Sequence, residues 1–276
     1  GWEKETEWQD FIPFDELPRV LNPEKGFIAT ANNKITPENY PYHISNVWAQ
    51  PYRYERIFEV LDTDELLTVD DMKDLQMDAT NLRAREFVPY LLDVIDDTAF
   101  GDREKTAIET LAKWDFVDDK EAAAPLIFDQ WFVQIEEIIY ADFSDELMDL
   151  FAGRQQTTDQ LLRRGDDSLW LEDHGGLEKV VTDAFVATLD WAEEAYGSNQ
   201  AKWQWGDFHQ VLFKHPLASA NKMLGYFFNA GKALPVDGSA VTPLAARPRA
   251  DGTVNHGASW RFVIDMADAE VGHHTV

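Results

Sequence analysis

Proline is concentrated at the start of this chain. Six of the twelve prolines fall in the first stretch of sequence, at Pro13, Pro18, Pro23, Pro37, Pro41 and Pro51. Proline lacks a backbone N–H and fixes φ, so it interrupts helices and the interior of sheets. Residues 1–60 are therefore predicted to form loops and short strands that wrap over another surface, without long helices.

Helical patterns dominate the middle of the chain, from about residue 64 to residue 200. Thr68 followed by two aspartates is a helix-start signal, because acids are favoured in the first turn. Three further segments place apolar residues at helical spacing, over residues 82–99, 127–139 and 181–196. Pro89 is expected to kink the first of these helices, and Gly197 to end the last.

The final region, residues 201–276, combines loops with a late strand. Trp260–Asp265 alternates in polarity and is rich in β-formers, and Phe27–Ala29 is a strand-like run near the other end. The chain is therefore predicted to be α+β. Neither strand has an evident partner between them, so both are expected to join a sheet completed by another segment. Regions 1–60, 61–200 and 201–276 are then parts of a single incomplete domain.

Charge and composition exclude several kinds of partner and site. The net charge of −27, from 51 acidic and 24 basic residues, repels phosphates and anionic lipids. We therefore expect no nucleic acid and no membrane partner. The absence of cysteine excludes disulfides and thiolate chemistry. The sequence also lacks P-loop, dinucleotide-binding, zinc-protease and nucleophile-elbow motifs, and no metal site is predicted.

Two adjacent asparagines raise the main functional question. Residues 26–35 read GFIATANNKI, so a strand-like run delivers Asn32 and Asn33 to its end. Asparagine pairs commonly form turns, because Asn tolerates a left-handed backbone and bonds to its own chain. The alternative is that one of the two side-chain amides is directed at a ligand.

Four groups of short stretches, in fixed order, resemble the β-chain of the penicillin acylase family of N-terminal nucleophile hydrolases. They are Phe11–Phe14 with Leu21–Pro23 and Gly26–Asn33, Tyr40–Pro41 with Trp48–Arg53 and Arg56–Ile57, Trp203–Gly206 with His209 and His215–Leu217, and Gly252–Asn255 with Ser259–Asp265. The resemblance implies a layered αββα fold, to which this chain would contribute a helical middle and strand-bearing ends. It also implies a location outside the cytoplasm.

The resemblance implies roles for particular residues. In this family an N-terminal serine uses its own α-amino group as base, attacks an amide carbonyl and forms an acyl-enzyme that water cleaves. Asn32 matches the side-chain amide that donates to the oxyanion, with Asn33 as the neighbouring alternative. Arg53 matches the arginine that positions the catalytic groups, with Arg56 as its alternative.

The chain also departs from the family pattern. It opens with Gly1 rather than serine, so the nucleophile is expected on a complementary chain or segment, and this chain alone is expected to be inactive. Family members that bind calcium use an aspartate near the position of residues 40–45, where none occurs, so no cofactor or metal is carried over.

The expected function is a component of an amidohydrolase. Its substrates would be small acyl amides of the penicillin G or V, cephalosporin or acyl-homoserine lactone kind. One alternative is a catalytically inert truncated, scaffold or binding module of the same fold, and another is a standalone enzyme that uses carboxylates.

We predict that the melting temperature rises between low salt and molar NaCl. The dispersed excess of negative charge repels itself, and added ions screen that repulsion, as in proteins adapted to high salt. Scanning calorimetry across the salt range measures the effect. A flat or falling melting temperature would contradict the halophile interpretation and leave the acids as an ordinary solvated surface.

Overall fold

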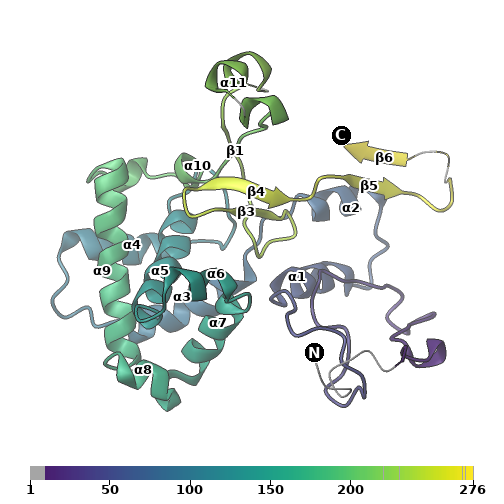
Figure 1. Ribbon diagram of the computed structural model, residues 1–276, viewed down its shortest axis with the longest axis horizontal. Helices are drawn as coiled ribbons and strands as arrows, with labels where there is room; N and C mark the ends of the chain where they lie inside the picture. Colours follow the sequence, from purple (N-terminus) through teal and green to yellow (C-terminus); the bar gives the residue numbers. More distant parts are fainter. Residues whose placement is uncertain (1–9, 220, 230, 269, 271, 276) are drawn as a thin grey trace.

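The helices of the middle region gather into one body with a shared core. The computed structural model describes residues 10–219, 221–229, 231–268, 270 and 272–275. The helices in this part of the chain, with η for a short 3-10 helix, are η2 (Phe14–Glu16), α1 (Tyr52–Leu61), α2 (Val69–Gln76), α3 (Leu82–Val94), α4 (Asp102–Ala112), α5 (Ala124–Ile139), α6 (Asp145–Leu150), α7 (Arg154–Arg164), η3 (Gly165–Asp167), α8 (Leu169–Asp173), α9 (Leu177–Tyr196), η4 (Gln200–Lys202), α10 (Trp205–Phe208), η5 (Pro216–Ser219) and α11 (Lys222–Phe228). Figure 1 shows α3 to α9 on one side of the molecule.

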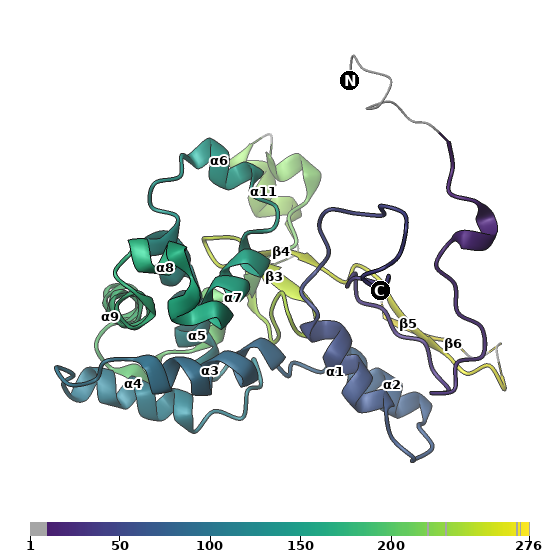
Figure 2. The ribbon, with the colours of Figure 1, turned by 90° about the horizontal axis from the view of Figure 1, so that it is seen from below.

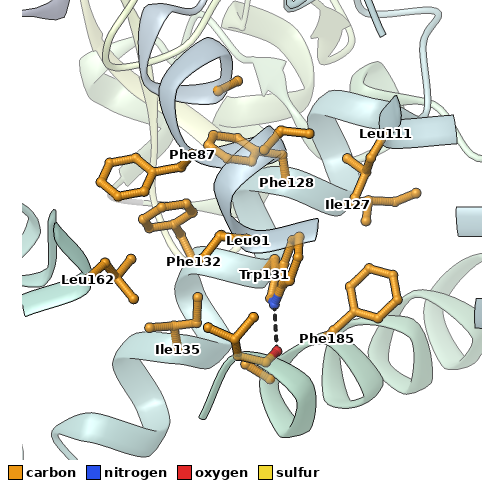
Figure 3. Packing of buried hydrophobic residues seen from close by; sticks show 14 of the residues in the cluster. Phe87, Leu91, Leu111, Ile127, Phe128, Trp131, Phe132, Ile135, Leu162 and Phe185 are labelled. Carbon is orange, nitrogen blue, oxygen red and sulfur yellow. Dashed lines mark hydrogen bonds between the residues drawn. The ribbon is translucent and has the colours of Figure 1, made fainter. Parts of the chain in front are cut away.

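Helix α5 is the centre of this core. Most of its side chains are buried, because it is apolar on several faces and packs against α9, α4 and α10. Trp131 lies with its ring centroid 4.8 Å from that of Phe185 and donates its indole N–H to the Val181 carbonyl at 2.9 Å (Figure 3). A buried indole N–H needs such a partner, so this contact fixes the register of α5 against α9.

Two small sheets follow the helical body. The strands within the described residues are β1 (Gln210–Val211), β2 (Leu234–Pro235), β3 (Ala246–Pro248), β4 (Thr253–Gly257), β5 (Arg261–Ile264) and β6 (Gly272–Thr275). The first sheet has the order β2-β1-β4-β3, with β1 parallel to β4 and the other neighbours antiparallel. Strands β5 and β6 form a separate antiparallel pair, and α11 lies on a projection beyond β1 (Figure 1).

The structure confirms the α+β prediction and the helical middle. Thr68 caps α2 through a reciprocal arrangement in which Asp71 accepts the Thr68 N–H at 2.7 Å and Thr68 Oγ1 accepts the Asp71 N–H. Pro89 lies inside α3, and Gly197, with φ of 83°, ends α9. Capping and periodicity therefore located these elements correctly.

Two predictions about the ends of the chain were wrong. The described part of the first region, residues 10–60, forms no long helix, and the ten-residue α1 begins only after Pro51, which stands at its N-cap, where a missing N–H is harmless. Phe27–Ala29 forms no strand in the described structure, and Phe27 instead packs its ring 5.3 Å from that of Phe58. The late strand β5 has a partner within the chain, because it pairs antiparallel with β6.

Asp118 joins the helical body to the loop that begins at Gly238, and its carboxyl group is buried. Asp118 is 1% exposed and accepts from Asn81 Nδ2 at 3.1 Å through both oxygens, while its backbone carbonyl accepts the Gly238 N–H at 2.8 Å. Burial raises the pKa of Asp118 to about 7, and burial likewise raises the pKa of Asp129 on α5 to about 6. Both groups are therefore more easily protonated in the folded state than in the unfolded chain.

We expect stability to fall as pH rises from about 5 to 8. A carboxyl whose pKa is raised by folding stabilises the fold fully below its unfolded pKa of about 3.9, and this contribution is lost as pH rises through the folded value. Asp118→Asn should therefore flatten the dependence, measured by urea unfolding at both pH values and constant ionic strength. Carboxyls with lowered pKa, such as Asp78, act in the opposite direction, but at pH values below this window.

The matched control is Asp64→Asn, which changes an exposed carboxyl. This variant should keep the pH dependence of the parent chain. If Asp118→Asn keeps it as well, the carboxyl of Asp118 does not titrate in this range and the prediction is wrong.

Candidate functional site

Asn32 stands at a sharp reversal of the chain. Its backbone is left-handed, with φ of 63°, and its carbonyl accepts the Ala49 N–H at 2.9 Å. Asparagine is one of the few residues that takes this conformation readily, so the sequence permits the reversal. The bond to Ala49 holds the loop beside the chain that leads into α1, while the side chain of Asn32 stays exposed.

Asn33 serves the turn itself. It is buried, its Oδ1 accepts the Ala31 N–H at 3.0 Å, and its Nδ2 donates to the Lys34 carbonyl at 3.1 Å. Both ends of this amide are thus used by neighbouring backbone. The turn interpretation therefore describes Asn33, whereas the side chain of Asn32 makes neither of these bonds.

Arg53, in the first turn of α1, contacts the Asn32 side chain directly. Its Nη2 donates to Asn32 Oδ1 at 3.1 Å, across 21 residues of sequence. A guanidinium has only donors, so the amide must turn its oxygen toward Arg53 and its Nδ2 away. Burial lowers the pKa of Arg53, and among the described residues its side-chain partner is the Asn32 amide oxygen rather than a carboxylate.

Arg56, the alternative to Arg53, binds a carboxylate instead of Asn32. Its Nε and Nη2 lie 2.8 and 2.7 Å from the same oxygen, Oδ2 of Asp78, so it forms an ion pair between α1 and the segment just after α2. The structure therefore brings Arg53, and not Arg56, to the candidate oxyanion donor.

Asn32 and Arg53 line a cavity of about 540 Å³. Gln50, Gln156, Arg247 and His256 also line it, together with small apolar residues of the 240–245 loop. Among its described lining residues there is no carboxylate and no hydroxyl or thiol. The cavity thus offers N–H donors and positive charge, and no nucleophile of the usual serine, threonine or cysteine kind.

The loop on the far wall of the cavity is held from two sides. Gly238 has φ of 79°, and a Cβ at this position would lie 2.2 Å from the Leu244 carbonyl oxygen, so only glycine fits. The Ser239 N–H donates to Thr242 Oγ1 at 2.9 Å. Through the bond from Gly238 to Asp118, this wall is attached to the helical core.

A buried polar network anchors the segment that carries Arg53. Asp159 on α7 is almost fully buried and accepts from Arg83 on α3, at 2.9 Å from Nε and 2.6 Å from Nη2. The same carboxylate also accepts from Gln50 Nε2, and the Tyr52 hydroxyl lies 3.1 Å from it. Gln50 and Tyr52, two of the three residues before Arg53, are thereby fixed to α7, and through Asp159 to Arg83 of α3.

The outer part of the network adds a forked ion pair. Arg163 binds Glu86 at 2.7 and 2.8 Å and donates to the Tyr52 hydroxyl at 2.9 Å. Sequence reasoning missed this set, because single acids carry no signal in so acidic a chain. The available clue was the stretch Trp48–Arg53, which contains Gln50 and Tyr52 beside the arginine.

His209 and His215 lie outside the cavity. His209 is fully buried, stacks on Trp205 at 4.4 Å, and its two ring nitrogens lie 2.8 Å from the carbonyl oxygens of Val236 and Ala246. It therefore ties α10 to the small sheet. Across the described residues, no group of three or more His, Asp or Glu side chains could hold a metal ion.

No described helix combines the length and the apolar character needed to cross a membrane.

Comparison with known proteins gives consistent matches. A family model described as penicillin amidase matches residues 1–276. The chain is 26% identical to penicillin acylase 2 proenzyme of Pseudomonas sp. (strain SE83), over 97% of this chain and 35% of that protein. It is 26% identical to acyl-homoserine lactone acylase QuiP of Pseudomonas syringae pv. syringae (strain B728a), over 88% of this chain and 32% of that protein. It is 23% identical to penicillin G acylase of Escherichia coli, over 72% of this chain and 27% of that protein. The chain spans about a third of the length of these curated relatives.

Asp159→Asn is expected to lower the free energy of unfolding by about 3–5 kcal/mol. The variant leaves the buried guanidinium of Arg83 without its counter-charge, and an unpaired buried charge is far more harmful than a missing pair. Urea unfolding of the chain measures the loss.

Two further variants test the cause. Glu86→Gln removes a carboxylate from the partly exposed end of the same network and should have an effect of about 1 kcal/mol or less. The double variant Arg83→Met with Asp159→Leu removes both charges and should be more stable than Asp159→Asn. If Asp159→Asn is no more harmful than Glu86→Gln, the pair does not anchor the segment.

Proposed function

The chain belongs to the penicillin amidase family, and we propose that it forms part of an enzyme that hydrolyses acyl amides. Its relatives carry the names penicillin acylase and acyl-homoserine lactone acylase. The observation that carries the proposal is the contact between Arg53 and Asn32 at the edge of the cavity, because it prepares an amide N–H for a ligand.

Asn32 is the proposed oxyanion donor. Attack on an amide carbonyl places negative charge on its oxygen, and a donor fixed in advance stabilises that charge without reorganisation. The bond from Arg53 to Oδ1 fixes the amide orientation, and Nδ2 has no partner within the described residues. A substrate carbonyl in the cavity could therefore accept this N–H.

Arg53 is the proposed positioning residue. Its guanidinium holds the Asn32 oxygen, and its positive charge lies close to the place where negative charge develops. The lowered pKa of this partly buried group reflects the desolvation of that charge. Desolvation strengthens the electrostatic effect of the charge on neighbouring groups.

The nucleophile in this proposal is an N-terminal serine of a complementary chain or segment. The lack of hydroxyl and thiol groups in the described cavity lining, and the threefold greater length of the relatives, support this arrangement. Apolar surface supports it too: Phe11 is 93% exposed and Tyr226 is 86% exposed. Figure 2 shows the N-terminal arm, defined as the described residues 10–30, extending away from the helical body. The complementary segment would cover these surfaces and complete a layered αββα core.

A second candidate is a catalytically inert module of the same fold. The exposed side chain of Asn32 and the missing nucleophile are compatible with it. The oriented amide favours the enzyme, because a plain turn needs only the bonds that Asn33 makes.

Asn32→Ala in the complete enzyme should lower the acylation rate by about a hundredfold or more. Removing one preorganised oxyanion donor typically reduces the rate by about 10²–10³-fold. Asn32→Asp should be at least as harmful, because it replaces the donor with a negative charge that faces the oxyanion. Single-turnover hydrolysis of a chromogenic acyl amide measures acylation directly.

Asn22→Ala is the matched control. Asn22 is an exposed asparagine of the same arm, also with a left-handed backbone, and it does not line the cavity. Its replacement should leave acylation unchanged. Asn33→Ala should act on stability, by about 1 kcal/mol, through its lost backbone bonds. A well-folded Asn32→Ala enzyme with parental acylation would show that Asn32 is not the oxyanion donor and would leave the asparagine pair as an ordinary turn.

A further inference from the structure

A single peptide group connects α7 to Asn32. The carbonyl of Trp48 accepts from Gln156 Nε2 at 2.7 Å. The N–H of the same peptide group, which belongs to Ala49, donates to the Asn32 carbonyl at 2.9 Å. In a planar trans peptide the C=O and the N–H point in opposite directions, so Gln156 and Asn32 are held at the two ends of one rigid unit.

Helix α7 is a firm support for this unit. Gln156 lies three residues before Asp159, so the two side chains share a face of α7. The Asp159 carboxylate accepts from Gln50, just before α1. In addition, the buried Thr158 donates to Glu136 Oε1 on α5 at 3.2 Å. The stretch that leads into α1 is therefore attached to α7 at two points, and α7 is attached to the core.

The backbone and the side chain of Asn32 are held from different helices. Arg53 of α1 donates to the side-chain oxygen, which orients the amide but leaves the backbone free to shift. The backbone is left-handed, with φ of 63°, and a non-glycine residue keeps this conformation where neighbouring contacts support it. The Ala49 N–H supplies such a contact. Because hydrogen bonds in a series polarise one another, the bond from Gln156 strengthens this N–H as a donor.

The place of this bonded series sets it apart from ordinary loop contacts. A partly buried carbonyl needs some donor, and a side-chain amide is a common one. Here, however, Gln156, Ala49 and Asn32 all line the same cavity, so the series ends at the candidate reaction site. A displacement of the peptide group is therefore passed to the residue that presents the side-chain N–H.

We propose that Gln156 is a positioning residue for Asn32 and that the Trp48–Ala49 peptide transmits its effect. Gln156 holds the backbone of Asn32 in place, while Arg53 sets the direction of the amide. The catalytic part of this proposal rests on the proposed amide hydrolysis, whereas the attachment of the peptide to α7 does not. A displacement of about 1 Å in such a group costs up to about a hundredfold in rate.

Hydrogen exchange on the chain itself tests the attachment without any hydrolysis. Gln156→Met keeps the length of the side chain and removes the N–H donor. The Ala49 amide, followed by NMR, should then exchange about fivefold faster or more, because its peptide group has lost one of its two bonds. Gln156→Glu, which keeps the shape and also lacks an N–H, should give the same result at neutral pH. Unchanged exchange in either folded variant would overturn the proposal.

Gln160→Met is the matched control, because Gln160 is an exposed glutamine of the same helix that does not line the cavity. Its replacement should leave both Ala49 exchange and acylation unchanged. If Gln160→Met speeds exchange as much as Gln156→Met does, the exchange reflects a general loosening of α7 and the proposal is wrong.

A double-mutant cycle in the complete enzyme tests transmission to the reaction. In single turnover of a chromogenic acyl amide, Gln156→Met should lower the acylation rate at saturating substrate about tenfold. It should change the half-saturating substrate concentration by less than about twofold, because the donor is misplaced rather than the substrate released. In an Asn32→Ala background the same substitution should have no further effect, because the group that Gln156 positions is already absent.

The outcomes separate this proposal from the proposed function. An equal loss in both backgrounds, or parental acylation by Gln156→Met, would overturn the positioning role and leave Asn32 as the oxyanion donor. Parental acylation by Asn32→Ala, with faster Ala49 exchange in Gln156→Met, would overturn the oxyanion role and leave the attachment of the loop to α7.

Discussion

The buried carboxylate of Asp159 is the contact on which the geometry of the site depends. From α7, this carboxylate accepts hydrogen bonds from Arg83 on α3 and from Gln50 and Tyr52 around the start of α1. It therefore connects three segments that are far apart in sequence. Burying such an ion pair adds little net stability compared with an apolar pair of similar volume. The Arg83–Asp159 pair instead fixes the positions of the residues that bind to it, since a buried charge tolerates very few arrangements of its partners.

Two consecutive residues at the start of α1, Tyr52 and Arg53, connect the buried network to the cavity. Successive residues of a helix point about 100° apart, so Tyr52 and Arg53 face different surroundings. Tyr52 is fixed among Asp159, Glu86 and Arg163, whereas Arg53 reaches the Asn32 side chain. The helical core therefore orients the Asn32 amide through two contacts. Asp159 fixes Tyr52 at the start of α1, and Arg53 on the same helix donates to the Asn32 amide oxygen.

Sequence patterns located what depends on local chemistry. Apolar periodicity located α3, α5 and α9, and Thr68 and Gly197 located helix ends. Resemblance named Asn32 and Arg53 as candidates, but their contact spans 21 residues and no local rule encodes it. The four-stranded sheet escaped prediction because its strands are very short and β1 pairs with the distant β4. Asp159 escaped because nothing in an acidic chain distinguishes a buried acid from the exposed ones.

The contrast between surface and cavity has a consequence for how such a site can work. At about 1 M salt the Debye length is about 3 Å, so long-range fields from the surface almost vanish while contacts inside the cavity persist. A negatively charged ligand would then no longer be repelled by the distant acids, while the cavity lining keeps Arg53, Arg247 and the Asn32 amide. An acidic exterior and a cationic cavity are therefore compatible, because salt screens the long-range field of the surface acids but not the short-range contacts in the cavity. The surface charge affects solubility and the rate of encounter, and the cavity residues determine binding.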